Sequence, residues 1–139
     1  MTYWLCVTNE ENWEVIKRNN IWGVPKARRK TLQKVEKGDK LVIYVRGVKN
    51  GTEQKPPRIV AAYEVSSEPF EDAGSMFLRE YPYRVKIRPI KIFEKPVEFR
   101  SLVPKLAFIK NKQNWNAYVR SSMRKIPEED FETIVSLAK

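Results

Sequence analysis

The chain has 139 residues, 42% of them hydrophobic, and its 27 Lys and Arg against 17 Asp and Glu give a formal net charge of +10. It has no histidine and one cysteine, Cys6, which excludes zinc sites, histidine-dependent catalytic triads and an intrachain disulfide. The length suits a single domain over residues 1–139. A small domain this basic repels itself unless an anionic partner lies nearby, and nucleic acid is the commonest such partner.

The first predicted elements are a buried strand and an amphipathic helix. Tyr3–Val7 (YWLCV) is a short apolar run, which is typical of a buried strand. In the next segment, TNEENWEVIKRNN, Thr8 and Glu11 have the spacing of a capping box. Trp13 and Ile16 lie three residues apart and share the face that we expect to be buried.

The segment NIWGVPKARRK, residues 20–30, follows the helix. Asn20 is a stop signal for the helix, and Gly23 and Pro25 prevent it from continuing. We therefore expect Trp22 in a loop, beside four basic residues. An indole held in that position is a candidate stacking face for a nucleobase, because every base presents a flat π-face.

The middle of the chain predicts two paired strands and two loops. Leu41–Val45 and Ile59–Val65 are rich in β-branched and aromatic residues, and we expect them to be antiparallel neighbours in a sheet. A polar loop joins them, and its Asn50–Gly51 pair favours a tight turn. The next segment, SSEPFEDAGSMFLREYP, predicts a long irregular loop, and loops of that length in small domains are often functional.

The longest strand signal is YRVKIRPIKIFEKPVEF. Val85 and Ile87 alternate with basic residues, whereas after Pro89 the apolar positions move to Ile90 and Ile92. A strict period of two cannot change parity without an extra residue, so we expect a bulge or bend near Pro89. Bends of this kind allow a sheet to curl into a barrel.

The C-terminal third predicts a short strand at KLAFI, a basic amphipathic segment at KNKQNWNAYVRSSMRK and a final helix. Pro127 suits the first helical position, and acidic residues fill the first turn. Phe131 and Ile134 begin the apolar face of this helix. The whole order predicts an α+β fold, a small curled β-barrel of five or six strands with short helices packed outside.

Several functional classes are disfavoured. The N-terminal residues lack a basic region before a long apolar run, so we expect no signal peptide, no membrane span and a cytoplasmic location. The sequence has no paired-carboxylate motif, no Gly-rich phosphate loop and no nucleophile elbow. We therefore expect no catalytic residue, no metal and no cofactor.

The basic residues gather in three groups, two of which contain aromatic residues. Each group alone is also typical of a solvated surface, and the strand group is the weakest signal. Basic residues interleaved with aromatic ones suit single-stranded nucleic acid, because cations neutralise phosphates and rings stack on bases. The groups are Lys26, Arg28, Arg29, Lys30 and Lys34 after Trp22; Arg84, Lys86 and Arg88; and Lys110, Lys112, Arg120, Arg124 and Lys125 around Trp115 and Tyr118.

The sequence resembles the EVE domain family. The ordered segments YWLCVTN, NWEVIKRNNIWGVP and GDKLVIYV are similar to the opening of that domain. The end, FIKNKQNWNAYVRSSMRKIPEEDFETI, is similar to its C-terminal segment. The resemblance covers nearly the whole chain. It implies a PUA-like fold, similar to YTH domains, which bind methylated adenine in RNA.

The resemblance also implies a pocket for one extruded, modified base. Thr8 and Asn9 would hydrogen-bond the base edge, and Trp22 with Gly23 would pack against the base. Met76 and Phe77 would supply the opposite wall. The implied contacts with the nucleic-acid backbone are Arg120, Ser121 and Arg124, and the charge pattern adds Lys26, Arg28 and Arg29 as phosphate contacts.

Other interpretations remain open at this point. Thr8 and Asn9 are also ordinary helix N-cap residues, and Met76 and Phe77 would serve equally well to anchor their loop. The expected protein is a non-catalytic nucleic-acid-binding module, for RNA more than DNA, that is a monomer or a weak homodimer. The alternatives are an RNA-processing enzyme or its subunit, and a basic module that binds an acidic protein.

Overall fold

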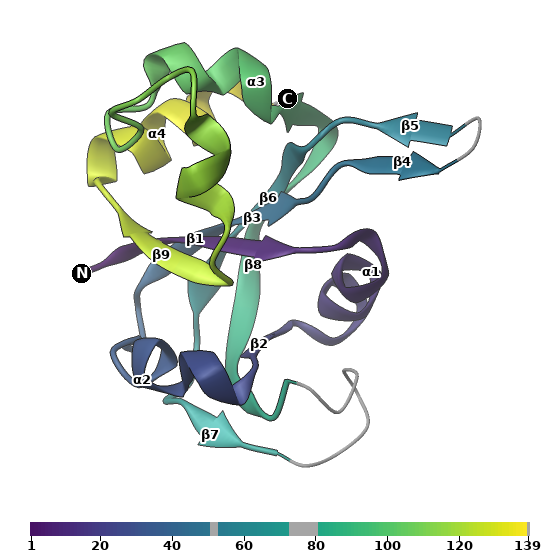
Figure 1. Ribbon diagram of the computed structural model, residues 1–139. Coiled ribbons are helices and arrows are strands. Elements are labelled where there is room, and N and C mark those ends of the chain that lie inside the picture. The colour runs from purple at the N-terminus through teal and green to yellow at the C-terminus, as the bar shows by residue number, and fades with distance from the viewer. Residues whose placement is uncertain (51–52, 73–80, 139) are drawn as a thin grey trace.

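A mixed β-sheet curls into a half-barrel, and helices pack outside it in the computed structural model, which describes residues 1–50, 53–72 and 81–138 (Figure 1). The strand order is β2-β8-β6-β3-β1-β9, and β7 also pairs with β8. All pairs are antiparallel except β1 with β3. The strands of this sheet are β1 (Tyr3–Thr8), β2 (Ile21–Val24), β3 (Lys40–Val45), β6 (Arg58–Val65), β7 (Phe70–Glu71), β8 (Tyr83–Glu98) and β9 (Met123–Ile126).

The remaining elements lie around this sheet. A hairpin of β4 (Val48–Asn50) and β5 (Glu53–Lys55) projects from one side within the predicted polar loop (Figure 1). The turn predicted at Asn50–Gly51 falls partly outside the described residues. The α-helices are α1 (Glu10–Asn19), α2 (Arg29–Leu32), α3 (Phe99–Leu102) and α4 (Glu128–Leu137), and the 3₁₀ helices are η1 (Lys26–Arg28), η2 (Val103–Lys105) and η3 (Trp115–Val119). In the described part of the chain, none of these helices has the length and apolar character needed to cross a bilayer.

The sheet separates two hydrophobic cores, which confirms the prediction of buried strands. In β1, Trp4 and Cys6 face a core that α1 and α2 complete, whereas Leu5 and Val7 face a second core beneath α3 and α4. Every residue of β1 is buried as a result. A strand covered on both faces has a continuous apolar sequence rather than an alternating one, which explains YWLCV.

Of the two residues predicted as N-caps, Thr8 and Asn9, only Asn9 caps helix α1. Thr8 is the last residue of β1 and pairs with Val45, so it cannot cap the helix. Asn9 is the N-cap, and its side-chain oxygen accepts a hydrogen bond of 2.8 Å from the backbone N–H of Asn12. At the other end, Asn20 stops the helix as predicted. Its φ of 55° is left-handed, and its N–H donates to the Ile16 carbonyl.

Trp22 lies in strand β2, not in a loop as predicted. The left-handed turn at Asn20 redirects the chain, and β2 then pairs antiparallel with β8, placing Trp22 opposite Val85. The side chain of Trp22 is only 2% exposed and belongs to the core beneath α1. Gly23 therefore occupies a strand, where backbone pairing outweighs its local preference for turns.

The predicted irregularity in β8 is confirmed. Tyr63 of β6 pairs with Pro89, but the preceding residue, Ala62, pairs with Lys91, so Ile90 is the extra residue of a bulge. The predicted apolar positions Ile90 and Ile92 are not core residues, because they are 46% and 41% exposed; the core residue after the bulge is Phe93, which is 4% exposed. Val85 and Ile87 lie in the core beneath α1, whereas Phe93 lies in the second core, so β8 contacts a different core on each side of the bulge.

One C-terminal prediction was wrong, and another was displaced by one residue. KLAFI is not a strand, because the N–H groups of Ala107 and Phe108 donate to the buried carboxylate of Asp130 and not to a neighbouring strand. The basic segment forms η3 and then β9, which pairs antiparallel with β1. Pro127 is the N-cap of α4, one position before the predicted one. Phe131 and Ile134 are buried on the inner face of α4, as predicted.

We expect the free energy of unfolding to fall between about pH 10 and pH 12 because of Tyr63. Its side chain is fully buried, and its hydroxyl has no hydrogen-bond partner among the described residues. Burial raises the pKa of Tyr63 to about 12. The pKa of Tyr63 is higher in the folded state than in the unfolded state. The contribution of its neutral hydroxyl to the unfolding free energy is therefore fully present below the unfolded-state pKa and is lost as the pH rises through the folded-state pKa.

Urea unfolding at several alkaline pH values measures this effect. Tyr63→Phe removes the titrating hydroxyl and keeps the ring, so its unfolding free energy should fall less over the same interval. Equal pH dependence in the two proteins would contradict the assignment to Tyr63.

Candidate functional site

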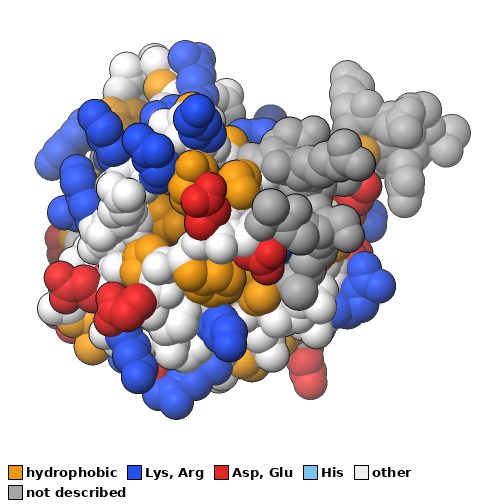
Figure 2. Space-filling view, turned by 90° about the horizontal axis from the view of Figure 1, so that it is seen from below, with side chains coloured by type: hydrophobic (Ala, Val, Ile, Leu, Met, Phe, Trp, Pro, Cys, Tyr) orange, Lys and Arg blue, Asp and Glu red, His pale blue; other side chains and the backbone are white. Residues whose placement is uncertain are grey.

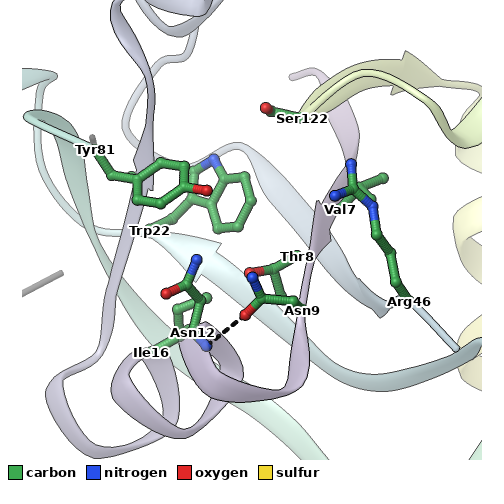
Figure 3. Close-up of a pocket in the computed structure, with 10 residues that line it drawn as sticks. Val7, Thr8, Asn9, Asn12, Ile16, Trp22, Arg46, Tyr81 and Ser122 are labelled. Carbon is green, nitrogen blue, oxygen red and sulfur yellow. Dashed lines mark hydrogen bonds between the residues drawn. The ribbon is translucent and has the colours of Figure 1, made fainter. Parts of the chain in front are cut away.

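A small cavity of about 30 Å³ lies where β1 and β3 end (Figure 3). That volume holds a water molecule or two. In Figure 3 the side chains of Trp22 and Tyr81 lie on one side of the cavity and Arg46 lies on the other. The described residues that line it are Val7, Thr8, Asn9, Asn12, Ile16, Trp22, Gly23, Arg46, Tyr81 and Ser122.

The parallel pairing of β1 with β3 brings the polar residues of this cavity together. Parallel strands end at the same edge of a sheet, and here Thr8 is opposite Val45. The N–H of Arg46 then donates to the carbonyl of Thr8 at 2.9 Å, so Arg46 is held beside the end of β1. On the opposite edge of β1, the N–H of Val7 donates to the carbonyl of Ser122 at 2.8 Å.

Two buried polar atoms of the cavity residues have no partner among the residues that the structure describes. These are Nε1 of Trp22, on a side chain that is 2% exposed, and Oδ1 of Asn12, on a residue that is 4% exposed. A buried polar group without a partner costs about 1–3 kcal/mol of stability. The cavity thus combines an aromatic ring with one unused donor and one unused acceptor, which suits a planar ligand with polar edges.

Arg84 fixes the backbone on which Tyr81 is carried. Its side chain is 1% exposed, and its Nε donates to the Tyr81 carbonyl at 2.9 Å. Its Nη1 contacts Oδ2 of Asp72 at 3.2 Å. A guanidinium is always charged, so its burial requires such partners. Arg84 therefore positions one wall of the cavity from behind, whereas the sequence pattern placed it in an exposed basic group.

The structure brings together four of the predicted base-contacting residues, namely Thr8, Asn9, Trp22 and Gly23. The prediction for Met76 and Phe77 lies outside the described residues. Four further polar residues line the cavity without having been predicted to do so. They are Asn12, Arg46, Tyr81 and Ser122.

For two of these four residues, Asn12 and Arg46, the sequence contains a pattern that could have indicated a role in the cavity. Asn12 is four residues before Ile16, so an amide lies on the buried face of α1, where polar groups are uncommon. Arg46 directly follows a buried strand. Its proximity to Thr8 depends on β1 and β3 being parallel, and the sequence did not indicate that orientation. Tyr81 and Ser122 carried no comparable signal.

The basic residues after Trp22 lie outside the cavity. Lys26 and Arg28 are exposed on η1, and Arg29 is exposed at the start of α2. The guanidinium carbon of Arg29 lies 5.9 Å from the ring centroid of Tyr83. The phosphate contacts predicted for these residues would therefore form on the surface beside the cavity.

The predicted backbone contacts Arg120, Ser121 and Arg124 have different environments in the structure. Arg120 is exposed, and the hydroxyl of Ser121 donates to the Met123 carbonyl at 3.4 Å. Arg124 is half-buried, with its guanidinium carbon 4.9 Å from the ring centroid of Phe108 and 5.5 Å from that of Tyr118. The side chain of Arg124 is thus engaged in packing, and none of the three predicted residues lines the cavity.

The described lining contains no side chain suited to the remaining catalytic alternatives. Carboxylates, lysines and cysteines are absent from it. Cys6 is fully buried in the core, and burial raises the pKa of its thiol well above the usual range. Within residues 1–50, 53–72 and 81–138, no three His, Cys, Asp or Glu side chains cluster so as to hold a metal ion.

Comparison with known proteins places this fold in a wider context. A family model described as the EVE domain matches residues 2–137. A UPF0310 protein of Pyrococcus horikoshii is 51% identical over an alignment 145 positions long, which covers 99% of each chain.

Solved structures with a similar fold include two complexes with nucleic acid. Human THYN1 in complex with DNA that contains 5-methylcytosine superposes with a TM-score of 0.66 and 16% identity, over 99% of this chain and 97% of THYN1. The YTH domain-containing protein mmi1, in complex with RNA, gives a TM-score of 0.68 and 10% identity, over 99% of this chain and 80% of that one. At these identities the similarity establishes the PUA-like fold.

We expect Asn9→Ala to lower the free energy of unfolding by about 1 kcal/mol, because the cap of α1 is lost. Asn9→Asp should leave stability nearly unchanged, because aspartate caps helices as well as asparagine does. Chemical denaturation of the three proteins measures the difference. If Asn9→Ala and Asn9→Asp unfold at the same denaturant concentration, the capping role of Asn9 is wrong.

Proposed function

Because the chain belongs to the EVE domain family, we propose that it is a non-catalytic nucleic-acid-binding module that holds one modified, flipped-out base in the cavity between β1, β2 and α1. Two proteins with this fold, THYN1 and mmi1, have been solved with DNA and with RNA respectively. RNA remains our first expectation for this chain.

The observation that carries the proposal is the pair of unsatisfied polar atoms at a buried aromatic wall. Nε1 of Trp22 and Oδ1 of Asn12 offer a donor and an acceptor to a ligand that enters the cavity. Ligand sites are typically apolar cavities with a few convergent polar groups. A nucleobase supplies both a flat apolar ring and hydrogen-bonding edges, so it matches both features of the cavity.

In such a complex, the free-energy cost of extruding the base is similar in size to the gain from stacking it. Extruding a base from its stack costs a few kcal/mol, and stacking on an aromatic side chain returns roughly 1–3 kcal/mol. A methyl group adds only about 0.8 kcal/mol when it is buried. Strong preference for a modified base therefore requires that the unmodified base leave Trp22 or Asn12 without a partner.

The cavity must widen to admit a base, since about 30 Å³ suits water and not an aromatic ring. The residues that line the cavity differ in how freely their side chains can move. Thr8, Asn12 and Trp22 are buried in the protein interior, whereas Arg46 is exposed and Tyr81 is half-buried. We expect Arg46 and Tyr81 to move apart and then to cover the bound nucleotide.

The chemistry of the lining supports binding over catalysis. The described lining offers hydroxyl groups, amides and one guanidinium, but no carboxylate or lysine that could serve as a general base. Arg46 can contact the phosphate of the flipped nucleotide, because a guanidinium pairs well with phosphate oxygens. The exposed Lys26, Arg28 and Arg29 then remain available for phosphates farther along the strand.

Trp22→Phe tests the cavity directly. It removes the unused Nε1 donor and keeps an aromatic ring, so we expect affinity for the modified base to fall about fivefold, which corresponds to one neutral hydrogen bond. Trp13→Phe is the matched control, since Trp13 is also buried in the same core but lies outside the cavity. This control variant should bind as the wild type does.

Fluorescence anisotropy measures this with short single strands that carry 5-methylcytosine or N6-methyladenine, in DNA and in RNA, each beside its unmodified counterpart. Equal affinity of the wild type for every modified and unmodified pair would refute base selection. Equal losses in Trp22→Phe and Trp13→Phe would refute the cavity as the site.

The salt dependence of binding tests the phosphate contacts. Each phosphate contact on a single strand contributes about −0.7 to the slope of log K against log salt. Lys26→Ala and Arg28→Ala should each make the slope shallower by about that amount, whereas the exposed Lys105 of η2, when changed to Ala, should leave it unchanged. Identical slopes in all three variants would contradict the assignment.

A further inference from the structure

A second hollow, a groove of about 300 Å³, lies between α2 and β7. Figure 2 views the molecule from this end and shows apolar side chains in the middle of the face, with Lys and Arg and a smaller number of Asp and Glu side chains among and around them. The groove shares no described residue with the cavity at Trp22. Its lining consists of Arg29, Leu32, Gln33, Pro69, Phe70, Glu71 and Tyr83.

The groove is built by the pairing of β7 with β8. Phe70 lies opposite Arg84, and Glu71 lies opposite Tyr83. Phe70 and Tyr83 are both half-buried, so each presents part of its ring to the groove. On the other side, Leu32 is 1% exposed and anchors α2 to the core. The hollow is therefore held open by packed elements.

The chemistry of the groove favours a base and disfavours a phosphate. The guanidinium of Arg29 lies over the ring of Tyr83 at 5.9 Å, an arrangement on which a further planar ring can stack. The amide of Gln33 and the carboxylate of Glu71 can hydrogen-bond to base edges. Because a carboxylate repels phosphates and acidic peptides, Glu71 argues against either as the occupant of the groove.

The charge beside the groove is complementary to a nucleic-acid backbone. No acidic residue occurs from Lys26 to Val35, a segment that forms η1 and α2. The basic residues of this segment outside the groove are exposed, and they can contact phosphates while a base occupies the groove. They are Lys26, Arg28, Lys30 and Lys34.

The groove and the cavity are close along the chain. Tyr81 lines the cavity and Tyr83 lines the groove, with Pro82 between them. The residue before a proline is extended, so the two tyrosines are separated by about 7 Å along the backbone. On β2, Gly23 at the cavity pairs with Arg84, and its neighbour Val24 pairs with Tyr83.

We propose that this groove binds the base of a nucleotide next to the flipped base, so that the protein recognises a single strand over at least two nucleotides. The inference rests on the proposed function, because the flipped base in the cavity sets the position of its neighbour. Phe70 and the guanidinium of Arg29, which lies over the ring of Tyr83, form the stacking face.

Abasic substitution tests the groove. The probes are short single strands with 5-methylcytosine or N6-methyladenine, in which the nucleotide on one side and then on the other is made abasic. We expect one of the two abasic sites to weaken wild-type binding about tenfold, because the stacking of one base is lost. The other abasic site should have little effect.

Phe70→Leu identifies the groove as the place where the neighbouring base binds. Leucine keeps apolar bulk and removes the ring face, so the variant should bind the intact strand as weakly as the wild type binds the sensitive abasic strand. It should bind the abasic strand as the wild type does. Phe131→Leu is the matched control, because it makes the same exchange in the second core, outside the groove, and should retain wild-type affinity.

Two results would overturn the inference. One is wild-type binding that is insensitive to both abasic sites, and the other is a Phe70→Leu variant that loses as much affinity for the abasic strand as for the intact one. In both cases the proposed function would stand, provided that Trp22→Phe still weakens binding of the modified base. If the wild type binds none of these strands, the proposed function itself fails and the inference fails with it.

Discussion

The parallel pairing of β1 with β3 is the constraint on which the rest of the structure depends. The buried carboxylate of Asp39 fixes its start, because it accepts hydrogen bonds from the N–H of Thr2, Nε1 of Trp4 and the N–H of Glu36. From there the register runs to Thr8 opposite Val45, where both strands end. The pairing at this end places the polar groups that β1 and β3 contribute to the cavity. A shift of one residue in the pairing of these strands would reverse which of their side chains face the cavity.

The cavity shares residues with the core beneath α1. Trp22 packs with Ile16 and Val85 in the core beneath α1, yet its indole nitrogen has no partner in the described part of the chain. A purely structural position would favour a phenylalanine, which has no donor to bury. Local rules of this kind are broken mainly at functional sites, and the rest of the fold compensates for the cost. The same reasoning applies to the amide of Asn12 on the inner face of α1.

Much of the fold could be predicted, whereas the site could be predicted only in part. The buried strands, the end of α1 at Asn20 and the bulge near Pro89 follow from local patterns, because each depends on neighbouring residues. The loop predicted around Trp22 and the strand predicted at KLAFI were wrong for a shared reason. In each case a distant partner, β8 or Asp130, satisfied the backbone in a way that local composition does not encode.

The sequence by itself determined the class of protein: a basic α+β domain without histidine, with a family resemblance that named Thr8, Asn9, Trp22 and Gly23. Only the tertiary structure decided which other side chains join them. Arg46, Tyr81 and Ser122 reach the cavity from segments far along the chain, through strand pairing and the backbone hydrogen bonds at its ends. Such contacts depend on the direction and register of strands, which are properties of the assembled sheet and not of any one segment.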